Sequence, residues 1–343
     1  MEKVQITIAD IARLSNVSKT TVSRIINGNY GKVNKETKER VLKIIEELDY
    51  QPNTLAQGLK QKTTNVIGIV LSKLHPFWSA VLEGVEDACR SRGYSLMISN
   101  TGDDPEIEVQ QIKSFIQRKV DGVIVSPTIH NKEFYEELIK RSYPIVAISR
   151  KTPNLSLNTV AMDDIKGAWL ATEHLLSLGK ERIMLVVYPP NEISPRYERV
   201  AGFEMTLKAH GNNLGWVEIV EEKPGRAKQK IIEVLKEKKV DAIISTNNNL
   251  NLEIMKAIKE SGLKVPQEIA IVGYDDSDWA ELVEPPLTTV YQPAYEMGEK
   301  AAKRLIELIK SSENSESETT MFDPKLIIRK SCGEKESREY DHK

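Results

Sequence analysis

The stretch that decides the N-terminal fold is residues 7–28, TIADIARLSNVSKTTVSRIING, which predicts two short helices joined by a tight turn. Thr7 is a good N-cap for a helix over residues 8–14, and Ser18 is a good N-cap for a second helix over residues 19–26. Two short helices joined in this way are typical of a helix-turn-helix. A third helix is expected to start near Asn34 and to run to Leu48.

The second helix of the pair presents short polar and basic side chains opposite its apolar residues: Lys19, Thr20, Ser23 and Arg24. An arginine can reach the O6 and N7 atoms of guanine, and a threonine can meet a base edge or a thymine methyl group. Taken from the helices alone, a small bundle with a solvated polar face explains the same pattern. The helix pair by itself therefore leaves both interpretations open.

The charge of the chain is divided unevenly along its length. Residues 1–62 hold 11 Lys and Arg against 7 Asp and Glu, a net charge of +4, whereas the remaining residues sum to −6. A small basic segment on a larger acidic body indicates that only the N-terminal segment meets a polyanion.

The composition places the chain among ordinary globular proteins of two or three domains: 343 residues, 40% of them hydrophobic and 29% charged. No run approaches the ~18 apolar residues of a membrane span, and the N-terminus lacks the apolar segment of a signal peptide, so we expect a cytoplasmic protein.

Cys89 and Cys332 are too few for a disulfide framework or a structural zinc site, and we expect buried free thiols. The five histidines are scattered, which argues against a metal site.

From Val66 onward, short apolar runs alternate with amphipathic helices, which is the pattern of parallel α/β sheets. We expect strands in two sets, over residues 66–71, 95–99, 122–126 and 145–148, and over 182–187, 217–220, 242–245 and 269–272. The helices between them are expected over residues 77–92, 105–118, 132–140, 165–178, 195–210, 227–236 and 250–261. A late helix is expected over 299–310, and one closing strand over 320–330.

A short internal sequence repeat relates the two sets of strands. Residues 119–125, KVDGVIV, match residues 239–245, KVDAIIS, at a helix-to-strand step. Two similar lobes would bind a ligand between them, at the carboxyl ends of the strands. The body contains no G-x-G-x-x-G after its first strand, no P-loop, no H-E-x-x-H and no G-x-S-x-G, so no catalytic residue is assigned and no enzyme is expected.

The amino-acid sequence of the N-terminal segment favours a DNA-binding helix-turn-helix over a small bundle with a solvated polar face. The motifs TIxDIA at 7–12, VSxxTVSR at 17–24, NG at 27–28 and DYxPN at 49–53 resemble the LacI/GalR family of bacterial transcription regulators. One departure is Asn16, where the family has glycine; asparagine tolerates the same left-handed backbone. The resemblance extends over about residues 7–330.

The resemblance implies an N-terminal all-α helix-turn-helix domain, followed by an α/β two-lobed, periplasmic-binding-protein-like domain with parallel sheets. Its boundaries fall at residues 1–52 for the DNA-binding domain, 53–64 for a hinge, 65–331 for the lobes and 332–343 for a polar tail. In the family the hinge helix orders only on operator DNA, and Leu59 aligns with a leucine that enters the minor groove. An ordinary linker is the alternative for residues 53–62.

The resemblance also implies which side chains contact DNA. Carried over by position, these are Thr7, Ser18, Lys19, Thr20, Thr21, Ser23, Arg24, Asn27, Asn53, Ala56 and Leu59. Lys19, Thr20 and Arg24 match the positions that read bases, and the residues around them match positions that touch phosphate or brace the helix.

The effector-binding residues implied by the family all follow expected strands or lie on the crossing between the lobes. They are His75, Phe77, Trp78, Asp103, Arg150, Arg199, Asn247, Asp275 and Gln292. His75 replaces the family's asparagine, and Asn248 replaces its aspartate. Alternatives stay open for several of them: Phe77 and Trp78 as core residues, Asp103 as a helix cap, and Arg150 as the partner of a lobe carboxylate.

These expectations describe a sequence-specific repressor of carbohydrate-utilisation genes. A homodimer would bind a pseudo-palindromic operator and respond to a sugar, sugar acid or sugar phosphate, without a cofactor or metal. An excess of cleft cations would favour the anionic effectors. Two alternatives compete: a global catabolite regulator with a phosphoprotein co-effector, and a sugar-binding transport protein, which would need a secretion signal and no basic helix-turn-helix.

Overall fold

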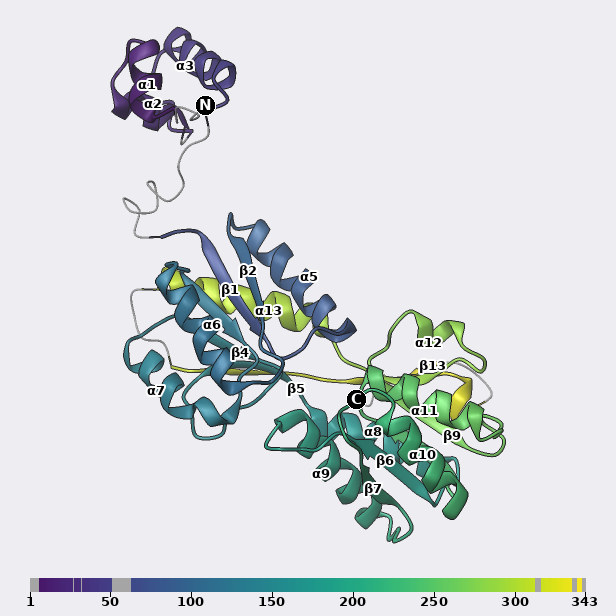
Figure 1. The fold of residues 1–343 in the computed structure, drawn as a ribbon. Helices are drawn as coiled ribbons and strands as arrows, with labels where there is room; N and C mark the ends of the chain where they lie inside the picture. Colours follow the sequence, from purple (N-terminus) through teal and green to yellow (C-terminus); the bar gives the residue numbers. More distant parts are fainter. Residues whose placement is uncertain are drawn as a thin grey trace. The chain divides into compact units, whose positions relative to one another are not determined.

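The computed structural model describes residues 6–26, 28–31, 33–50, 63–311, 316–334 and 338–340. The chain divides into two compact units, Met1–Thr64 and Asn65–Lys343. The first is a cluster of short helices, and the second contains two parallel α/β lobes (Figure 1). Among the described residues, no helix combines the length and the apolar character that crossing a membrane requires.

The described residues of the N-terminal unit form three helices, α1 (Ile8–Leu14), α2 (Lys19–Ile26) and α3 (Lys35–Glu47), as the sequence predicts. They enclose a small core in which Ile11, Val22, Ile25 and Val41 are at most 1% exposed.

Local hydrogen bonds explain where these helices start. The Thr7 hydroxyl donates to Asp10 at 2.7 Å, and the Thr21 amide donates to the Ser18 hydroxyl at 3.1 Å. The turn between α1 and α2 places Asn16 at φ 50°, in the left-handed region where asparagine is among the few tolerated side chains.

The first lobe is a six-stranded parallel sheet in the order β11-β5-β4-β3-β1-β2. Its strands are β1 (Val66–Leu71), β2 (Ser95–Asn100), β3 (Gly122–Val125), β4 (Ile145–Ile148), β5 (Asn158–Met162) and β11 (Thr319–Phe322). Its helices are α5 (Pro76–Arg90), α6 (Pro105–Gln117), α7 (Lys132–Lys140) and α13 (Ala294–Lys310), with the short turn η1 (Ile129–Asn131) before α7. Helices α5 and α13 pack backbone against backbone, because a Cβ at Gly84 would lie 2.0 Å from the Tyr295 carbonyl oxygen.

The second lobe is a seven-stranded sheet in the order β13-β12-β10-β9-β8-β6-β7, in which β12 runs antiparallel to both of its neighbours. Its strands are β6 (Ile183–Val187), β7 (Trp216–Ile219), β8 (Ala242–Ser245), β9 (Ala270–Tyr274), β10 (Thr288–Tyr291), β12 (Lys325–Ile328) and β13 (Arg338–Tyr340). Its helices are α8 (Asp164–Ser177), α9 (Ser194–Ala209), α10 (Arg226–Glu237), α11 (Asn248–Glu260) and α12 (Trp279–Leu282), with η2 (Lys330–Cys332) after β12.

Within the described residues, the chain crosses between the lobes three times: from β5 to α8, from β10 to α13, and from β11 to β12. The single closing strand expected over residues 320–330 is wrong, because β11 belongs to one lobe and β12 to the other. Pro324 stands between them and has no amide hydrogen to donate to a continuous strand ladder.

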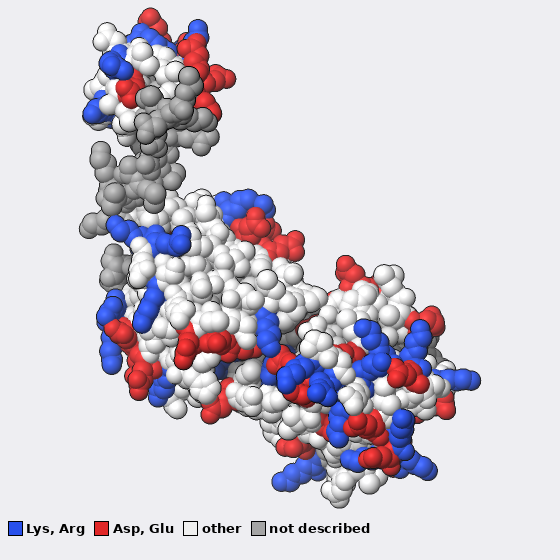
Figure 2. Space-filling model, in the orientation of Figure 1, with Lys and Arg blue, Asp and Glu red and all other residues white. Residues whose placement is uncertain are grey.

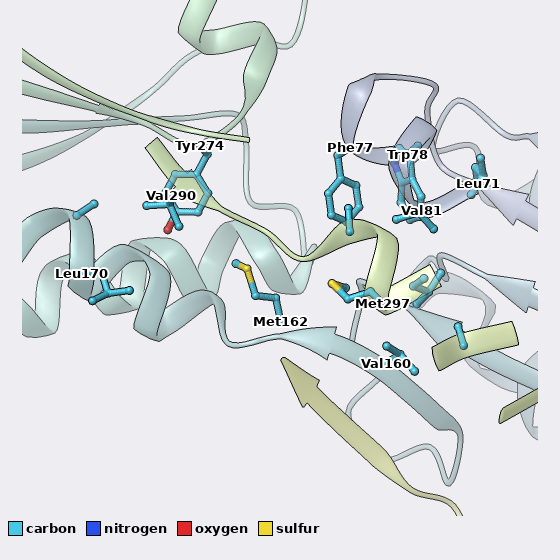
Figure 3. Close-up of a cluster of buried hydrophobic side chains, with 14 of the residues drawn as sticks. Leu71, Phe77, Trp78, Val81, Val160, Met162, Leu170, Tyr274, Val290 and Met297 are labelled. Carbon is cyan, nitrogen blue, oxygen red and sulfur yellow. The ribbon is translucent and has the colours of Figure 1, made fainter. Parts of the chain in front are cut away.

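The hydrophobic core continues from one lobe into the other. In Figure 3, Met162 lies between Tyr274 and Val290 on the second-lobe side and Met297 and Phe77 on the first-lobe side. The side chains of this cluster are buried, so a relative movement of the lobes has to pivot about packed apolar contacts rather than about a solvated linker.

Both cysteines are buried free thiols, as predicted, and burial raises the pKa of Cys89 to about 11. The segment 332–343, expected to be a polar tail, begins with buried Cys332 and contains β13, which pairs with β12.

Candidate functional site

A cavity of about 160 Å³ opens between the two lobes, at the carboxyl ends of their strands. Residues that follow β1, β2 and β4 line it from the first lobe, and residues that follow β6, β7, β8 and β9 line it from the second. The cavity brings together all nine predicted effector residues: His75, Phe77, Trp78, Asp103, Arg150, Arg199, Asn247, Asp275 and Gln292.

Arg199 lies on α9, lines this cavity and is only 7% exposed. Its guanidinium forms an ion pair with Asp164 at 2.7 Å and also donates to the Thr246 carbonyl oxygen. It lies over the ring of Tyr274, 4.3 Å from the ring centroid. Burial raises the pKa of Asp164 to about 6, although the positive charge of Arg199 acts in the opposite direction.

Asp275 follows β9 with φ 65°, and its carboxylate faces backbone and amide donors. It accepts a hydrogen bond from the Asn248 amide at 2.9 Å and another from the Gln292 side chain. Asn247 also lines the cavity, but its side-chain oxygen accepts from the Leu250 amide at 3.0 Å and so caps α11.

The first-lobe charges are paired. Arg150 forms an ion pair with Asp103, so the alternative of an internally paired arginine holds in this structure. Asp103 is not the helix cap, because Asp104 accepts the amide hydrogen bonds that start α6.

Three ion pairs that the sequence analysis does not predict span the cavity or line its wall. Lys73, from the first lobe, lies 2.6 Å from Glu222 of the second lobe and 3.7 Å from Asp103. Arg196 contacts the same glutamate at 2.8 Å. Lys73 and Glu222 both come shortly after a strand, so the rule that selected the other candidates would also have selected them.

These pairs change the charge balance expected of the cleft. With Glu222 and Asp164 included, four carboxylates face the four cations Lys73, Arg150, Arg196 and Arg199. An anionic effector would therefore have to compete with a carboxylate for each guanidinium.

The aromatic wall of the cavity belongs to the core as well. Phe77 and Trp78 are 8% and 3% exposed and pack edge to face at 5.1 Å, yet both contribute to the cavity lining. The core and effector interpretations of these two residues are thus compatible. His75 stands at the N-cap position of α5, and burial lowers its pKa, which favours a neutral imidazole near pH 7.

In the N-terminal unit, α2 presents Lys19, Thr20 and Arg24 to solvent. Thr21 and Ser23 are half-buried, while Thr7 and Ser18 are exposed and take part in the cap hydrogen bonds described above. The remaining predicted DNA contacts lie outside the described residues: Asn27, Asn53, Ala56 and Leu59.

The drawn surface of the second lobe carries charges of both signs, whereas the exposed charged side chains of α2 are basic. Figure 2 shows Lys and Arg beside Asp and Glu over the second lobe, so neither sign of charge dominates on the face drawn. In the part of the chain that the structure describes, no group of three or more His, Cys, Asp or Glu side chains is arranged to hold a metal ion.

A helix-turn-helix unit combined with two parallel α/β lobes around a polar cleft defines a bacterial regulatory protein with a ligand-binding body. The chain belongs to the LacI family of transcriptional regulators. Residues 7–53 match the lacI family of bacterial regulatory proteins, and residues 172–332 match the periplasmic binding protein-like domain.

Known relatives support this assignment along nearly the whole chain. The HTH-type transcriptional regulator KdgR of Bacillus subtilis (strain 168) is 34% identical over 333 residues, covering 95% of this chain and 97% of the relative. The repressor PurR of Aliivibrio fischeri (strain MJ11) is 31% identical, with 95% and 98% covered.

Two solved structures are similar over 95% of this chain and 99% of their own. A Lac repressor dimer bound to operator and the anti-inducer ONPF has a TM-score of 0.85 at 26% identity. The complex of the transcriptional regulator CelR with cellobiose has a TM-score of 0.70 at 28% identity. The predicted fold class is therefore confirmed.

Proposed function

We propose that this regulator is a repressor of carbohydrate-utilisation genes whose affinity for operator DNA is set by a sugar-type effector bound between its lobes. The observation that carries the proposal is the convergence of nine predicted residues, contributed by both lobes, on one cavity. A ligand that contacts both lobes stabilises one arrangement of them over another, which is the requirement for allosteric control.

The chemistry of the cavity suits a carbohydrate. Phe77, Trp78 and Tyr188 supply aromatic surface for the apolar face of a sugar ring. Asp103 and Asp275 can accept hydrogen bonds from ring hydroxyls, and Asn247 can both donate and accept. Because each cleft guanidinium already has a carboxylate partner, hydroxyl groups are the anchors that disturb the existing ion pairs least.

The DNA-binding part of the proposal rests on α2. Lys19, Thr20 and Arg24 are exposed on one helix whose other face is buried in the core of the N-terminal unit. We assign base reading to these three and phosphate or bracing contacts to Thr7, Ser18, Thr21 and Ser23. By family position, the assignment extends to Asn27, Asn53, Ala56 and Leu59, in a hinge between residues 53 and 64.

We further propose a homodimer, which a pseudo-palindromic operator requires. Large apolar side chains remain exposed in the body: Ile98 on edge strand β2 is 52% exposed, and Leu282 on α12 is 83% exposed. A second copy would cover such surface. The matched Lac repressor structure is itself a dimer on operator DNA.

No catalytic step is assigned to the cleft. We expect the protein to act in the cytoplasm, because that is where bacterial operator DNA lies.

The competing proposal is a global regulator whose co-effector is a phosphoprotein. The convergence of charged and aromatic side chains inside the cleft favours a small ligand, because a protein partner would bind an outer surface.

The test has two stages. Selection of binding sites from random DNA with the full-length protein first defines the operator. Fluorescence anisotropy then measures operator affinity with neutral sugars, sugar acids and sugar phosphates added one at a time. We expect one carbohydrate to shift the operator Kd by about 5- to 150-fold. A panel with no effect, together with a shift produced by a phosphorylated carrier protein, would favour the competing proposal.

A further inference from the structure

A second cavity, of about 270 Å³, adjoins the first. Apart from Pro105, which opens α6, and Lys151, which follows β4, its own lining comes from the loop that follows β3 and from the loop before α9, including Pro127, Thr128, His130 and Asn191. The two cavities meet at a set of shared residues: Lys73, Asp103, Arg150, Ile193, Arg196 and Glu222. None of the nine effector positions inferred from the family lies only in the second cavity.

The wall of the second cavity is fixed by a buried carboxylate. Glu108 of α6 is fully buried, and its oxygens accept from the Thr128 amide at 3.0 Å and from the Thr128 hydroxyl at 3.1 Å. They also accept from Asn131 at 2.8 Å and from the Tyr135 hydroxyl at 2.6 Å. Four donors on one side chain hold the loop over residues 127–131 in place, so this part of the lining is preorganised.

The first cavity alone is smaller than an ordinary ligand pocket. Ligand pockets usually measure roughly 300–1,000 Å³, and the first cavity alone is only about half the lower end of that range. The first and second cavities together exceed the lower limit. A ligand of conventional size in this cleft would therefore extend past the shared residues into the second cavity.

The two cavities also differ in chemistry. The first has the aromatic surface of Phe77, Trp78 and Tyr188, whereas the lining of the second contains no Phe, Trp or Tyr and is mostly polar. Lys151 in the second cavity contacts Glu198 of the opposite lobe at 2.5 Å, so this cavity also spans both lobes. Such a site suits a second hydroxyl-rich unit that hydrogen-bonds along its edges without stacking.

We propose that the second cavity is a subsite for a second sugar unit, so that the effector is a carbohydrate of disaccharide length. The first ring lies against Phe77, Trp78 and Tyr188, and the linkage between the units passes the shared residues. The second unit lies against His130, Lys151 and the loop held by Glu108. This inference rests on the proposed function, since it concerns the ligand of the same cleft.

Matched pairs of sugars test the length of the effector. Isothermal titration of the full-length protein compares cellobiose and maltose with glucose, lactose with galactose, and digalacturonate with galacturonate. We expect at least one disaccharide to bind about tenfold or more tightly than its monosaccharide. A monosaccharide that binds at least as tightly as every disaccharide overturns the subsite and leaves the proposed function intact. No binding by any carbohydrate overturns both.

A substitution that fills the second cavity tests its location. His130→Trp places a large side chain at an exposed position of that lining. We expect it to weaken the disaccharide about tenfold or more, and to leave the monosaccharide within about twofold. His210→Trp, on an exposed position at the end of α9 outside both cavities, is the matched control. Equal effects of His130→Trp on mono- and disaccharide would overturn the proposal.

Discussion

Arg199 donates a hydrogen bond of 3.1 Å from Nη2 to Oε1 of Gln292, which lies in the crossing segment between β10 and α13. The side-chain nitrogen of the same glutamine donates to Asp275. One residue on a connection between the lobes thus contacts two of the second-lobe side chains that we expect to hold the effector, Arg199 and Asp275. A ligand that moves Arg199 or Asp275 changes the contacts of this connection, which gives effector binding a direct physical route to the arrangement of the lobes.

The first prediction follows from that route. Gln292→Ala removes one side chain from the cavity lining and should lower effector affinity. It should also reduce the effect of bound effector on operator affinity, because the crossing segment no longer contacts Arg199 and Asp275. A coupling of typically 1–3 kcal/mol should fall by about half or more. Operator Kd values measured with and without saturating effector give the coupling directly. Gln229→Ala, at an exposed position of α10, is the control, and wild-type coupling in Gln292→Ala would contradict the route.

Arg199→Lys tests the guanidinium itself. Lysine keeps the charge but loses the planar fork that contacts Asp164, Thr246 and Gln292 at once. A hydrogen bond to a charged group contributes about 1.5–3 kcal/mol, so effector affinity should fall roughly 10- to 100-fold. Isothermal titration measures this loss.

The same substitution should also lower the free energy of unfolding, because Asp164 stays buried with fewer donors around it. Arg141→Lys, at an exposed ion pair with Glu137, is the matched control and should change neither quantity. An Arg199→Lys variant that binds effector as tightly as the wild type would remove this arginine from the site.

Asp164 gives a prediction for pH. Burial raises the pKa of its carboxyl from 3.8 to about 6, while Arg199 and Lys151 act to lower it and Glu198 acts to raise it. The folded protein therefore holds this proton at pH values where the unfolded chain releases it. The resulting stabilisation is fully present below about pH 4 and is lost as the pH rises through about 6.

Asp164→Asn removes that contribution. Between about pH 4 and 6, the free energy of unfolding should fall more steeply in the wild type than in the variant, by up to about 3 kcal/mol in total. Denaturant unfolding at a series of pH values measures the difference. Asp323→Asn, at an exposed carboxylate, serves as control. Parallel curves for wild type and Asp164→Asn would show that this group does not titrate in the range.

The sequence predicts most of the fold because its signals are local. The apolar runs that become β1, β4 and β8 are bounded by turn residues, and their predicted limits are close to those observed. The sequence analysis does not predict strands β5 and β10. Both are only four or five residues long and lead directly into crossing segments between the lobes, so neither shows the alternation of strand and amphipathic helix that marks the other strands.

Some residues of the site can be predicted from the sequence, and others cannot. Residues that follow a strand were predictable, because parallel strands bring their carboxyl ends to one edge of a sheet. The partners of the cleft arginines were not all predictable: Asp164 opens α8, where an acidic residue is expected simply as a favourable first-turn charge. Its pairing with Arg199, 35 residues away, depends on the packing of α8 against α9.

The last prediction concerns DNA. Arg24→Ala should lower the preference for the selected operator over a scrambled duplex by roughly 5- to 150-fold, because a base-edge contact carries about 1–3 kcal/mol of discrimination. Affinity for the scrambled duplex should fall much less, since phosphate contacts do not depend on sequence. Both duplexes must be measured at one fixed salt concentration, because salt alone shifts both affinities. Lys43→Ala, on the exposed face of α3, is the control and should leave the ratio of the two affinities unchanged. If Arg24→Ala also leaves that ratio unchanged, Arg24 does not read a base, and the recognition role passes to Lys19 and Thr20 on the same helix.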